Sequence, residues 1–501
     1  MEEFILALDQ GTSSSRALLY DNSGKTISIA QQAIEMSHPK DGWVEQDPNE
    51  IWHSVLATGR EVITSSGIDP KFIKGIGITN QRETTLVWNK KTGECVYNAI
   101  VWQDRRTIST CIEMDSATLD GKALSEQIAD KTGLLIDPYF SSTKLHWILS
   151  EIVASDSSLD IDDLLFGTVD TYLIWKLTGG HSHATDVTNA SRTQLLNIST
   201  LEWDEDLLKY FDIPGFLLPK VLDSSAQYGY AEEKWFGAPI PITGVAGDQQ
   251  AALVGQCCFD SGMSKVTLGT GCFIMTNTGS EKSLPKDGLL TTIAYRINGQ
   301  TSYASEGSIF VAGQAVKWLR DQLGIIESVK DTEKAFVATK GDAGGVSVLP
   351  AFTGLGAPHW DPEARGLISG LTLDTSVEQI VVATLQSIAL QIADLVSLML
   401  KGGPVDQLRV DGGMAVNDPF CQFLADILGQ NVNRPIDTET TARGAALLAG
   451  LGSGVWKDLN EIRATWQAER IFTPDMEQSL RNSLVEEFAL SVERAKLRLK
   501  S

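Results

Sequence analysis

The sequence predicts an α/β protein built from two similar domains. Strand-like apolar runs alternate with segments of helical apolar spacing through most of the chain. A strand, a small polar turn and a second strand occur in the same arrangement twice, around residues 4–20 and again around residues 263–275. The two copies lie roughly 255 residues apart and each opens a mixed α/β half, which indicates an internal duplication. We place the domain boundary between residues 1–253 and 254–501.

Length and composition agree with a multi-domain globular protein. The chain has 501 residues, of which 43% are hydrophobic and 21% are charged, and these values argue against disordered and collagen-like chains. Its 41 lysines and arginines are outnumbered by 64 aspartates and glutamates, so the formal net charge is −23. A field of that sign repels phosphate backbones and anionic lipids, so we expect neither nucleic acid nor a membrane as a partner.

The cysteines and the N-terminal residues predict a cytoplasmic protein. The six cysteines show no C-x-x-C spacing, which favours a reducing compartment. Glu2 and Glu3 stand where a secretory signal peptide carries basic residues, and the apolar run after them is short. The longest apolar stretch, residues 379–400, contains polar side chains at helical spacing and therefore predicts a core helix rather than a membrane span.

The first predicted hairpin carries hydroxyl groups at its tip. A strand-like run over residues 4–8 ends at Asp9 and is followed by the polar residues 10–15. Glycine and consecutive hydroxyl residues in a tight turn direct several donors to one spot, which suits a polyphosphate, and Asp9 can hold Mg²⁺. The alternative is an ordinary exposed turn, since the same residue types are common in turns. The related turn at residues 269–271, which can close on the same nucleotide, favours phosphate binding.

An arginine and a glutamate follow the next strand-like run. Arg82 and Glu83 come shortly after residues 73–78 and offer forked donors and an acceptor, which complement a polyhydric alcohol. Trp102 and Tyr139 can add an aromatic wall and a hydroxyl group. Such charged pairs are more often surface ion pairs, and the aromatic segments equally fit the edge of a core, so both alternatives stay open.

Asp248 stands near the middle of the chain, between a predicted strand and a predicted helix. The strand covers residues 239–248 and the helix covers residues 249–255. A carboxylate at a domain junction can accept the proton of a substrate hydroxyl as it attacks a γ-phosphoryl group, with Gln249 hydrogen-bonding the substrate. Alternatively, Asp248 simply caps the helix.

A third glycine-rich turn lies in the second half. The apolar residues 408–410 lead into Asp411, two glycines and Met414, and then into a helix that extends to about residue 427. A strand, a DGG turn and a helix in this order suit a ligand at the end of the strand. At the end of the chain, residues 479–500 predict a surface helix that is packed through one apolar stripe.

Several of these motifs, in this order, resemble the FGGY family of carbohydrate kinases, and in particular its members that act on glycerol. The resemblance covers nearly the full length of the chain. The segments that carry it are LALDQGTSSSR (6–16), GITNQRETTLVW (77–88), IVWQDRR (100–106), DPYFSSTK (137–144), LFGTVDTYLIWKLT (165–178), ATDVTNASRT (184–193), GVAGDQQAAL (244–253), TLGTGCF (267–273), PAFTGLGAP (350–358) and VDGGMAVND (410–418).

The resemblance implies a fold and an activity. The fold would consist of two actin-like (ribonuclease H-like) domains with a cleft between them. Mg-ATP would bind in that cleft and phosphorylate glycerol to sn-glycerol 3-phosphate, which is the first step of glycerol catabolism. Closure of the domains would exclude water and so disfavour wasteful hydrolysis of ATP. The resemblance also implies a homodimer or a homotetramer.

The resemblance further implies roles for individual residues. Asp248 would be the general base at the 3-hydroxyl group, and Asp9 and Asp248 would lie by Mg²⁺. Glycerol would be held by Arg82, Glu83, Trp102, Tyr139, Asp248, Gln249 and Phe273. ATP would contact Thr12, Ser13, Ser14, Arg16, Thr270, Gly313, Lys317, Gly413 and Asn417. Lys317 departs from the family pattern, which often has glutamine there, so this nucleotide contact is either lost or replaced by a charged one.

Two rival functions follow from the same residues. Another FGGY kinase would act on a ketopentose or a larger polyol, for which Trp102 and Phe273 leave too little room. A nucleotide-gated interaction module, such as a chaperone ATPase domain, would hydrolyse ATP without a polyol and would leave Asp248 without a purpose. Residues 228–239 lack the Gly-Gly-Thr-Arg loop that binds fructose 1,6-bisphosphate in some bacterial members, and the regulatory histidine of others. We therefore expect neither control to operate.

Overall fold

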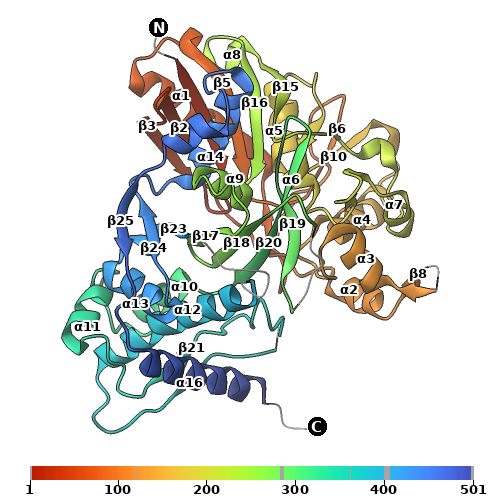
Figure 1. Cartoon of the computed structure of the whole chain (residues 1–501). Helices are drawn as coiled ribbons and strands as arrows, with labels where there is room; N and C mark the ends of the chain where they lie inside the picture. Colours follow the sequence, from red (N-terminus) through yellow and green to blue (C-terminus); the bar gives the residue numbers. More distant parts are fainter. Residues whose placement is uncertain (1–2, 120, 283–286, 362, 400–406, 498–501) are drawn as a thin grey trace.

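A large mixed sheet runs through both halves of the protein (Figure 1). The structure, a computed structural model, describes residues 3–119, 121–282, 287–361, 363–399 and 407–497. In order across the sheet, the strands are β25 (Ala468–Phe472), β24 (Val432–Pro435), β23 (Gln407–Asp411), β17 (Met263–Leu268), β18 (Cys272–Gly279), β20 (Gln300–Ile309), β19 (Leu290–Ile297), β15 (Ser225–Ala231), β16 (Ile240–Gly247), β5 (Ile73–Asn80), β1 (Phe4–Gln10), β2 (Ser14–Asp21) and β3 (Thr26–Ala33).

One strand pattern occurs in each half of this sheet. In the first half, β1, β2 and β3 are antiparallel neighbours, and β5 and then β16 continue the sheet parallel to β1. In the second half, β17, β18 and β20 are the antiparallel neighbours, and β23 and β24 continue parallel to β17. The same order of five strands therefore appears twice, in agreement with the predicted α/β fold of two similar domains.

Two helices pack across the junction between the halves. Helix α9 (Asp248–Gly255) packs on β17, β18 and β19 of the second half as well as on β16 and β5 of the first, whereas α14 (Thr440–Ser453) of the second half packs on β1, β5 and β16 of the first. Figure 1 shows the result, because the blue α14 lies among the strands from the start of the chain. Where α9 and α14 cross, a Cβ atom at Gly255 would overlap the Thr440 carbonyl oxygen, and one at Gly444 would overlap that of Ala251. The two helices are thus in contact backbone to backbone.

This crossing predicts that an added methyl group is destabilising. We expect Gly444→Ala to lower the free energy of unfolding by about 1–3 kcal/mol, because the helices must separate, although alanine is otherwise the better helix former. Denaturant unfolding followed by circular dichroism measures the change. Gly215→Ala is the matched control, since the nearest atom to its Cβ would be Leu208 Cδ1 at 3.8 Å. Equal stability of the Gly444→Ala variant and the control would contradict the prediction.

The predicted core helix and the predicted C-terminal helix are both present over their described residues. Helix α12 (Val377–Met399) packs against α11 (Asp331–Thr339) and α13 (Asp418–Leu428). Among the described residues, it is the one helix long and apolar enough to cross a membrane, and 72% of that stretch is buried inside the protein. Helix α16 (Gln478–Lys496) buries one stripe, Phe488, Ser491 and Val492. The predicted residue 400 and residues 498–500 lie outside the described residues.

The remaining helices and short strands complete the two halves. Helix α1 (Pro48–Ser66) covers β1, β2 and β3. The other helices are α2 (Ile108–Asp115), α3 (Leu124–Thr132), α4 (Ser141–Trp147), α5 (Val169–Leu177), α6 (Val187–Ala190), α7 (Glu205–Tyr210), α8 (Glu233–Phe236), α10 (Gly313–Asp321) and α15 (Leu459–Ala464). Short strand pairs are β4 (Glu45–Gln46) with β7 (Ala99–Ile100), β6 (Leu86–Asn89) with β10 (Leu164–Gly167), β8 (Thr118–Leu119) with β9 (Lys122–Ala123), β11 (Ala184–Asp186) with β14 (Lys220–Leu222), β12 (Leu196–Asn197) with β13 (Glu202–Trp203), and β21 (Ser347–Leu349) with β22 (Leu367–Ser369).

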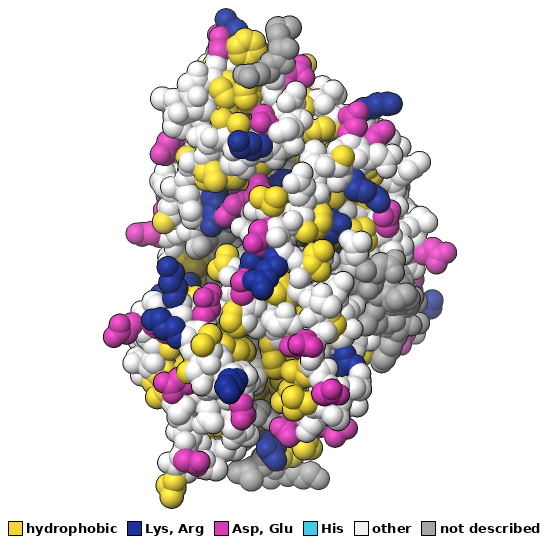
Figure 2. All heavy atoms as spheres, turned by 60° about the vertical axis from the view of Figure 1, so that its left-hand side comes forward, with side chains coloured by type: hydrophobic (Ala, Val, Ile, Leu, Met, Phe, Trp, Pro, Cys, Tyr) yellow, Lys and Arg dark blue, Asp and Glu magenta, His cyan; other side chains and the backbone are white. Residues whose placement is uncertain are grey.

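Charged side chains of both signs are mixed on the surface. On the face shown in Figure 2, lysines and arginines are interspersed with aspartates and glutamates. On this face, the acidic residues whose excess gives the net charge of −23 are therefore not gathered into one patch.

Candidate active site

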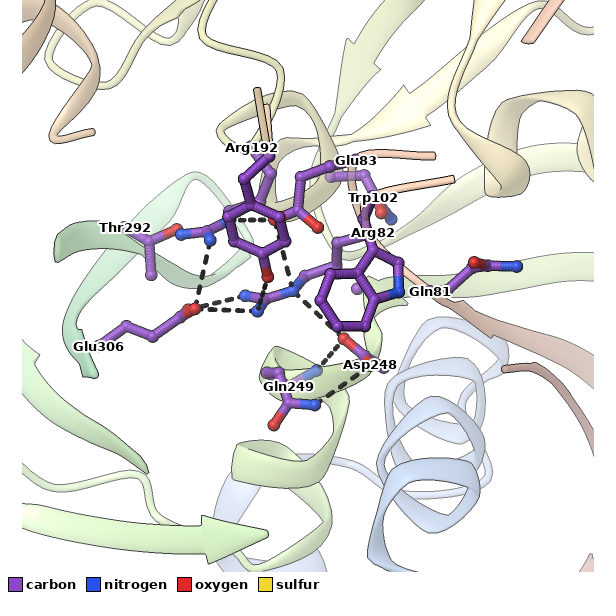
Figure 3. Close-up of polar contacts among 12 residues, drawn as sticks. Gln81, Arg82, Glu83, Trp102, Arg192, Asp248, Gln249, Thr292 and Glu306 are labelled. Atoms are coloured by element: carbon purple, nitrogen blue, oxygen red, sulfur yellow. Dashed lines mark hydrogen bonds and ion pairs between the residues drawn. The ribbon is translucent and has the colours of Figure 1, made fainter. Parts of the chain in front are cut away.

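The candidate site lies where three parallel strands of the first half end. In β1, Asp9 is paired with Thr79 of β5, and Asn80 of β5 is paired with Gly247 of β16. Since the carboxyl ends of parallel strands meet at one edge of a sheet, the residues that follow these strands come together. Asp248 and the predicted pair Arg82 and Glu83 are thereby brought to one place, as Figure 3 shows.

Arg82 is the centre of this group. Its Nη1 and Nη2 atoms donate to the two carboxylate oxygens of Glu306 at 2.7 and 2.9 Å. Its Nη2 atom also lies 3.4 Å from the hydroxyl group of Tyr139, and its Nε atom lies 3.2 Å from Asp248 Oδ1. The side chain is only 2% exposed. The alternative of a surface ion pair is therefore wrong, and Arg82 instead connects Asp248 to a buried carboxylate of β20.

Glu83 is paired with a second buried arginine. Arg192 Nε donates to Glu83 Oε1 at 2.6 Å, and Arg192 Nη2 lies 3.2 Å from Glu306 Oε1. Arg82, Glu83, Arg192 and Glu306, the ion-pair cluster hereafter, are all at most 2% exposed. Desolvation raises the pKa of Glu306, but the charges of Arg192 and Arg82 outweigh it and lower this pKa to about 2. Glu306 is therefore ionised, and its charge compensates the two guanidinium groups together with Glu83.

Arg192 and Glu306 were not among the predicted site residues. Arg192 lies in a segment that carries the family resemblance, although the sequence alone assigned it no role. Glu306 lies in β20 among small residues, and a lone acidic side chain inside a buried strand is the signal that could have identified it. Neither partner could be named from the sequence, because each pairs with residues from distant segments.

Asp248 is the first residue of α9, and its carboxylate is held at both oxygens. Oδ1 accepts a hydrogen bond from the Gln249 backbone N–H at 2.7 Å, and Oδ2 accepts one from Gln249 Nε2 at 3.1 Å. The N-cap position of α9 is occupied by Gly247, so the capping role considered for Asp248 is not supported. At 31% exposure, the Asp248 side chain is accessible to a substrate while it remains in contact with the buried Arg82.

Three aromatic rings lie beside these charged groups. The ring of Trp102 packs edge to face against Tyr139 and Phe273, with centroid distances of 5.5 and 6.4 Å. Trp102 Nε1 also donates to Thr12 Oγ1 at 2.9 Å, which connects the wall to the first hairpin. Phe273 comes from β18 in the second half, so the aromatic wall is assembled from both halves.

The first hairpin places a second carboxylate near Asp248. Desolvation, together with the charges of Asp248 and Glu439 and against the opposing effect of Arg16, raises the pKa of Asp9 to about 7. Arg16 Nη1 contacts Glu439 at 2.5 Å, and the Ser14 hydroxyl group accepts from Gln31 at 3.0 Å. The Ser13 side chain is exposed. Burial is the largest of these effects on the pKa of Asp9, and the repulsion by Asp248 is smaller.

The predicted nucleotide residues of the second half surround the second turn. The Thr270 carbonyl accepts from the backbone N–H groups of Ala312 and Gln314 at 3.0 and 3.1 Å. Gly313 begins α10, and a Cβ there would lie 2.6 Å from the Gly269 carbonyl oxygen, so this close approach requires glycine. The turn is therefore packed directly on the start of α10.

The other three predicted nucleotide residues lie on α10, directly after the turn that follows β23, and at the N-cap of α13. Lys317 is exposed on α10, and Gly413 is exposed after β23. Asn417 caps α13 by accepting from the Phe420 backbone N–H at 2.9 Å, and its Nδ2 donates to Thr332 Oγ1 at 2.9 Å. The Asn417 side chain thus has a structural function, and its contact with adenosine stays a prediction.

Comparisons with known proteins identify relatives over the whole chain. The models of the FGGY family of carbohydrate kinases match residues 4–255 (N-terminal domain) and 264–453 (C-terminal domain). A glycerol kinase of Marinomonas sp. is 50% identical over 499 residues, covering 99% of this chain and 100% of the relative. Glycerol kinase 2 of Thermotoga maritima is 52% identical over 496 residues, covering 98% of this chain and 99% of the relative. The crystal structure of Plasmodium falciparum glycerol kinase with ADP matches with a TM-score of 0.90 and 35% identity, covering 99% of each chain.

Proposed function

Because the chain belongs to the FGGY family of carbohydrate kinases, we infer that it transfers the γ-phosphoryl group of ATP to glycerol. Relatives named glycerol kinase share about half of its residues over nearly the whole length. The observation in the site that carries the proposal is the partly exposed Asp248 carboxylate, held by the buried Arg82. A carboxylate in that position can take up a proton from a bound hydroxyl group.

The reaction follows from the chemistry of these groups. The 3-hydroxyl oxygen of glycerol attacks the γ-phosphorus as Asp248 accepts the hydroxyl proton. A new bond forms between that oxygen and phosphorus, and the bond from phosphorus to the bridging oxygen breaks with its electron pair leaving on ADP. Arg82, Glu83 and Gln249 hold the glycerol hydroxyl groups, and Trp102, Tyr139 and Phe273 form the wall of a site for a small triol. The product is sn-glycerol 3-phosphate.

The two carboxylates at the strand ends fit a magnesium ion. Among the described residues there is no group of three or more His, Cys, Asp or Glu side chains placed to hold a metal. Mg²⁺ in kinases nevertheless needs only one or two carboxylates together with water and phosphate oxygens. The charge of Asp248 contributes to the raised pKa of Asp9, after the larger effect of burial, and this electrostatic interaction supports a site shared by the two carboxylates. We propose that Asp9 and Asp248 hold the ion, which would neutralise charge on the phosphates when bound.

The nucleotide is proposed to lie between the two related turns. The first hairpin offers Thr12, Ser13, Ser14 and Arg16 to the outer phosphates. The second half offers Thr270 and Gly313 to the phosphates, and Gly413, Asn417 and Lys317 toward the adenosine. The repeated strand order supports this arrangement. The first turn connects β1 and β2, and the second turn connects β17 and β18, so the two turns occupy equivalent positions in the two halves.

Domain boundary, assembly and location are proposals as well. The ranges that the two family models match support a boundary close to residues 253 and 254. The proposed cytoplasmic location rests on the cysteine pattern and the N-terminal residues. The proposed homodimer or homotetramer rests on the family resemblance, and light scattering on the purified protein would test it.

The first experiment is to measure ADP release with Mg-ATP alone and then with glycerol, xylulose, ribulose or erythritol. Strong stimulation by glycerol alone is expected, because the aromatic wall leaves room for a small triol. Stimulation by a sugar would leave the assignment of the phosphate site intact but would contradict the assignment of the aromatic-walled site to glycerol. A high rate without any polyol would instead indicate a nucleotide-gated module.

A further inference from the structure

Two routes of polar contacts run from the second half of the protein to the carboxylate of Asp248. The first begins at Glu306 on β20, which contacts both terminal nitrogens of Arg82 at 2.7 and 2.9 Å. This bidentate contact fixes the plane of the guanidinium group and leaves its Nε atom directed at Asp248 Oδ1, 3.2 Å away (Figure 3). The orientation of Oδ1 therefore depends on a glutamate from the other half.

The second route begins at Lys265 on β17. Its side chain is completely buried, and Nζ donates to Gln249 Oε1, to Thr267 Oγ1 at 2.8 Å and to the Phe273 carbonyl at 3.5 Å. An ammonium group can only donate, so the carbonyl oxygen of the Gln249 amide must face Lys265. The amide nitrogen then faces the other way, and it donates to Asp248 Oδ2 at 3.1 Å.

We propose that Lys265 and Glu306 are positioning residues that fix the two oxygens of Asp248 through Gln249 and Arg82 respectively. The proposal rests on the role of Asp248 as general base given above. Neither positioning residue reaches Asp248 directly, and each acts through one intervening side chain. Both come from the second half, whereas the base begins a helix of the first, so the contact between the halves sets the orientation of the base.

The burial of Lys265 supports a functional reason for its charge. Desolvation lowers the pKa of Lys265, which shows that the site disfavours an ammonium group. A methionine of similar length would occupy the same space without that cost. All three donors of Lys265 are nevertheless used, and one of them determines which end of the Gln249 amide faces Asp248.

A double-mutant cycle tests the route through Gln249. The kcat and the KM for glycerol are measured for the wild type, Lys265→Met, Gln249→Ala and the double variant. We expect Lys265→Met to lower kcat by roughly 10–100-fold, the effect typical of residues that orient a functional group without touching the substrate. The KM for glycerol should change less than the kcat. In the Gln249→Ala background, Lys265→Met should lower kcat by less than about 3-fold, because the Gln249 side chain through which Lys265 acts is already absent.

The matched control is Lys131→Met. Lys131 on α3 is ion-paired to Asp204 and Asp206 at 2.7 and 2.6 Å and has no contact with a site residue among those described. Its loss should leave kcat unchanged. An unchanged kcat for Lys265→Met, or an equal loss in both Gln249 backgrounds, would overturn the proposal. If Lys265→Met does not fold, Lys265→Arg and Lys265→Gln replace it, and equal kcat values for these two folded variants would overturn it.

The same data separate this inference from the proposed function. A wild type that glycerol does not stimulate, or an Asp248→Asn variant that keeps its turnover, contradicts the proposed function whatever Lys265 does. An active wild type with an inactive Asp248→Asn variant and an unaffected Lys265→Met variant contradicts the positioning role alone.

Discussion

Replacing Asp248 with asparagine should lower turnover by several orders of magnitude while glycerol and ATP still bind. Asparagine has the size and shape of aspartate, but its amide is not basic enough to accept the hydroxyl proton. General base catalysis contributes about 10²–10⁴-fold in enzymes, and the loss of a carboxylate from the proposed Mg²⁺ site adds to this. The effect should therefore appear in kcat far more than in binding.

A coupled assay of ADP release gives the kcat of this variant, and calorimetric titration gives its affinities for glycerol and ATP. Asp260→Asn is the matched control, because Asp260 forms an exposed ion pair with Arg463 at 2.7 Å. Turnover close to that of the wild type in Asp248→Asn would show that another group accepts the proton. Loss of binding together with turnover would indicate that Asp248 mainly supports the structure of the site.

Replacing Glu306 with alanine should reduce the free energy of unfolding by about 3–5 kcal/mol, the usual effect of removing one partner from a buried ion pair. Glu306 is completely buried and contacts both Arg82 and Arg192, at 2.7 and 3.2 Å. Without it, only Glu83 and the partly exposed Asp248 face the two buried guanidinium groups, and the terminal nitrogens of Arg82 lose the carboxylate that pairs with both of them. Water cannot solvate these buried nitrogens, so leaving them without their partner destabilises the folded state.

Urea unfolding of the wild type and the Glu306→Ala variant measures this loss. Asp260→Ala removes one partner of an ion pair whose side chains are 44% and 58% exposed. Exposed pairs contribute less than about 1 kcal/mol, so this control should lie close to the wild type. Equal losses in the two variants would mean that the ion-pair cluster stabilises the fold no more than a surface pair does.

Much of the fold and of the candidate site could be predicted from the sequence. Alternating apolar patterns and the repeated strand, turn and strand device are local features, and local features determine which segments form strands and helices. Polar residues directly after a strand, such as Arg82 and Asp248, can be recognised because strand ends are where parallel sheets collect functional groups. The core helix near residues 379–400 was likewise evident from its own spacing.

The partners of those residues were decided only by the tertiary structure. Arg82 is paired with Glu306, which lies 224 residues away in the chain, and Glu83 is paired with Arg192, 109 residues away. The proposed positioning role of Lys265 depends on its contact with the side-chain amide of Gln249, a residue 16 positions away in the chain. Whether a charged side chain is an exposed ion pair or a buried one depends on what distant segments of the chain place against it. Local sequence can therefore identify a charged residue at a strand end, but only the packing of distant segments, within one half or between the two, determines which charge it meets.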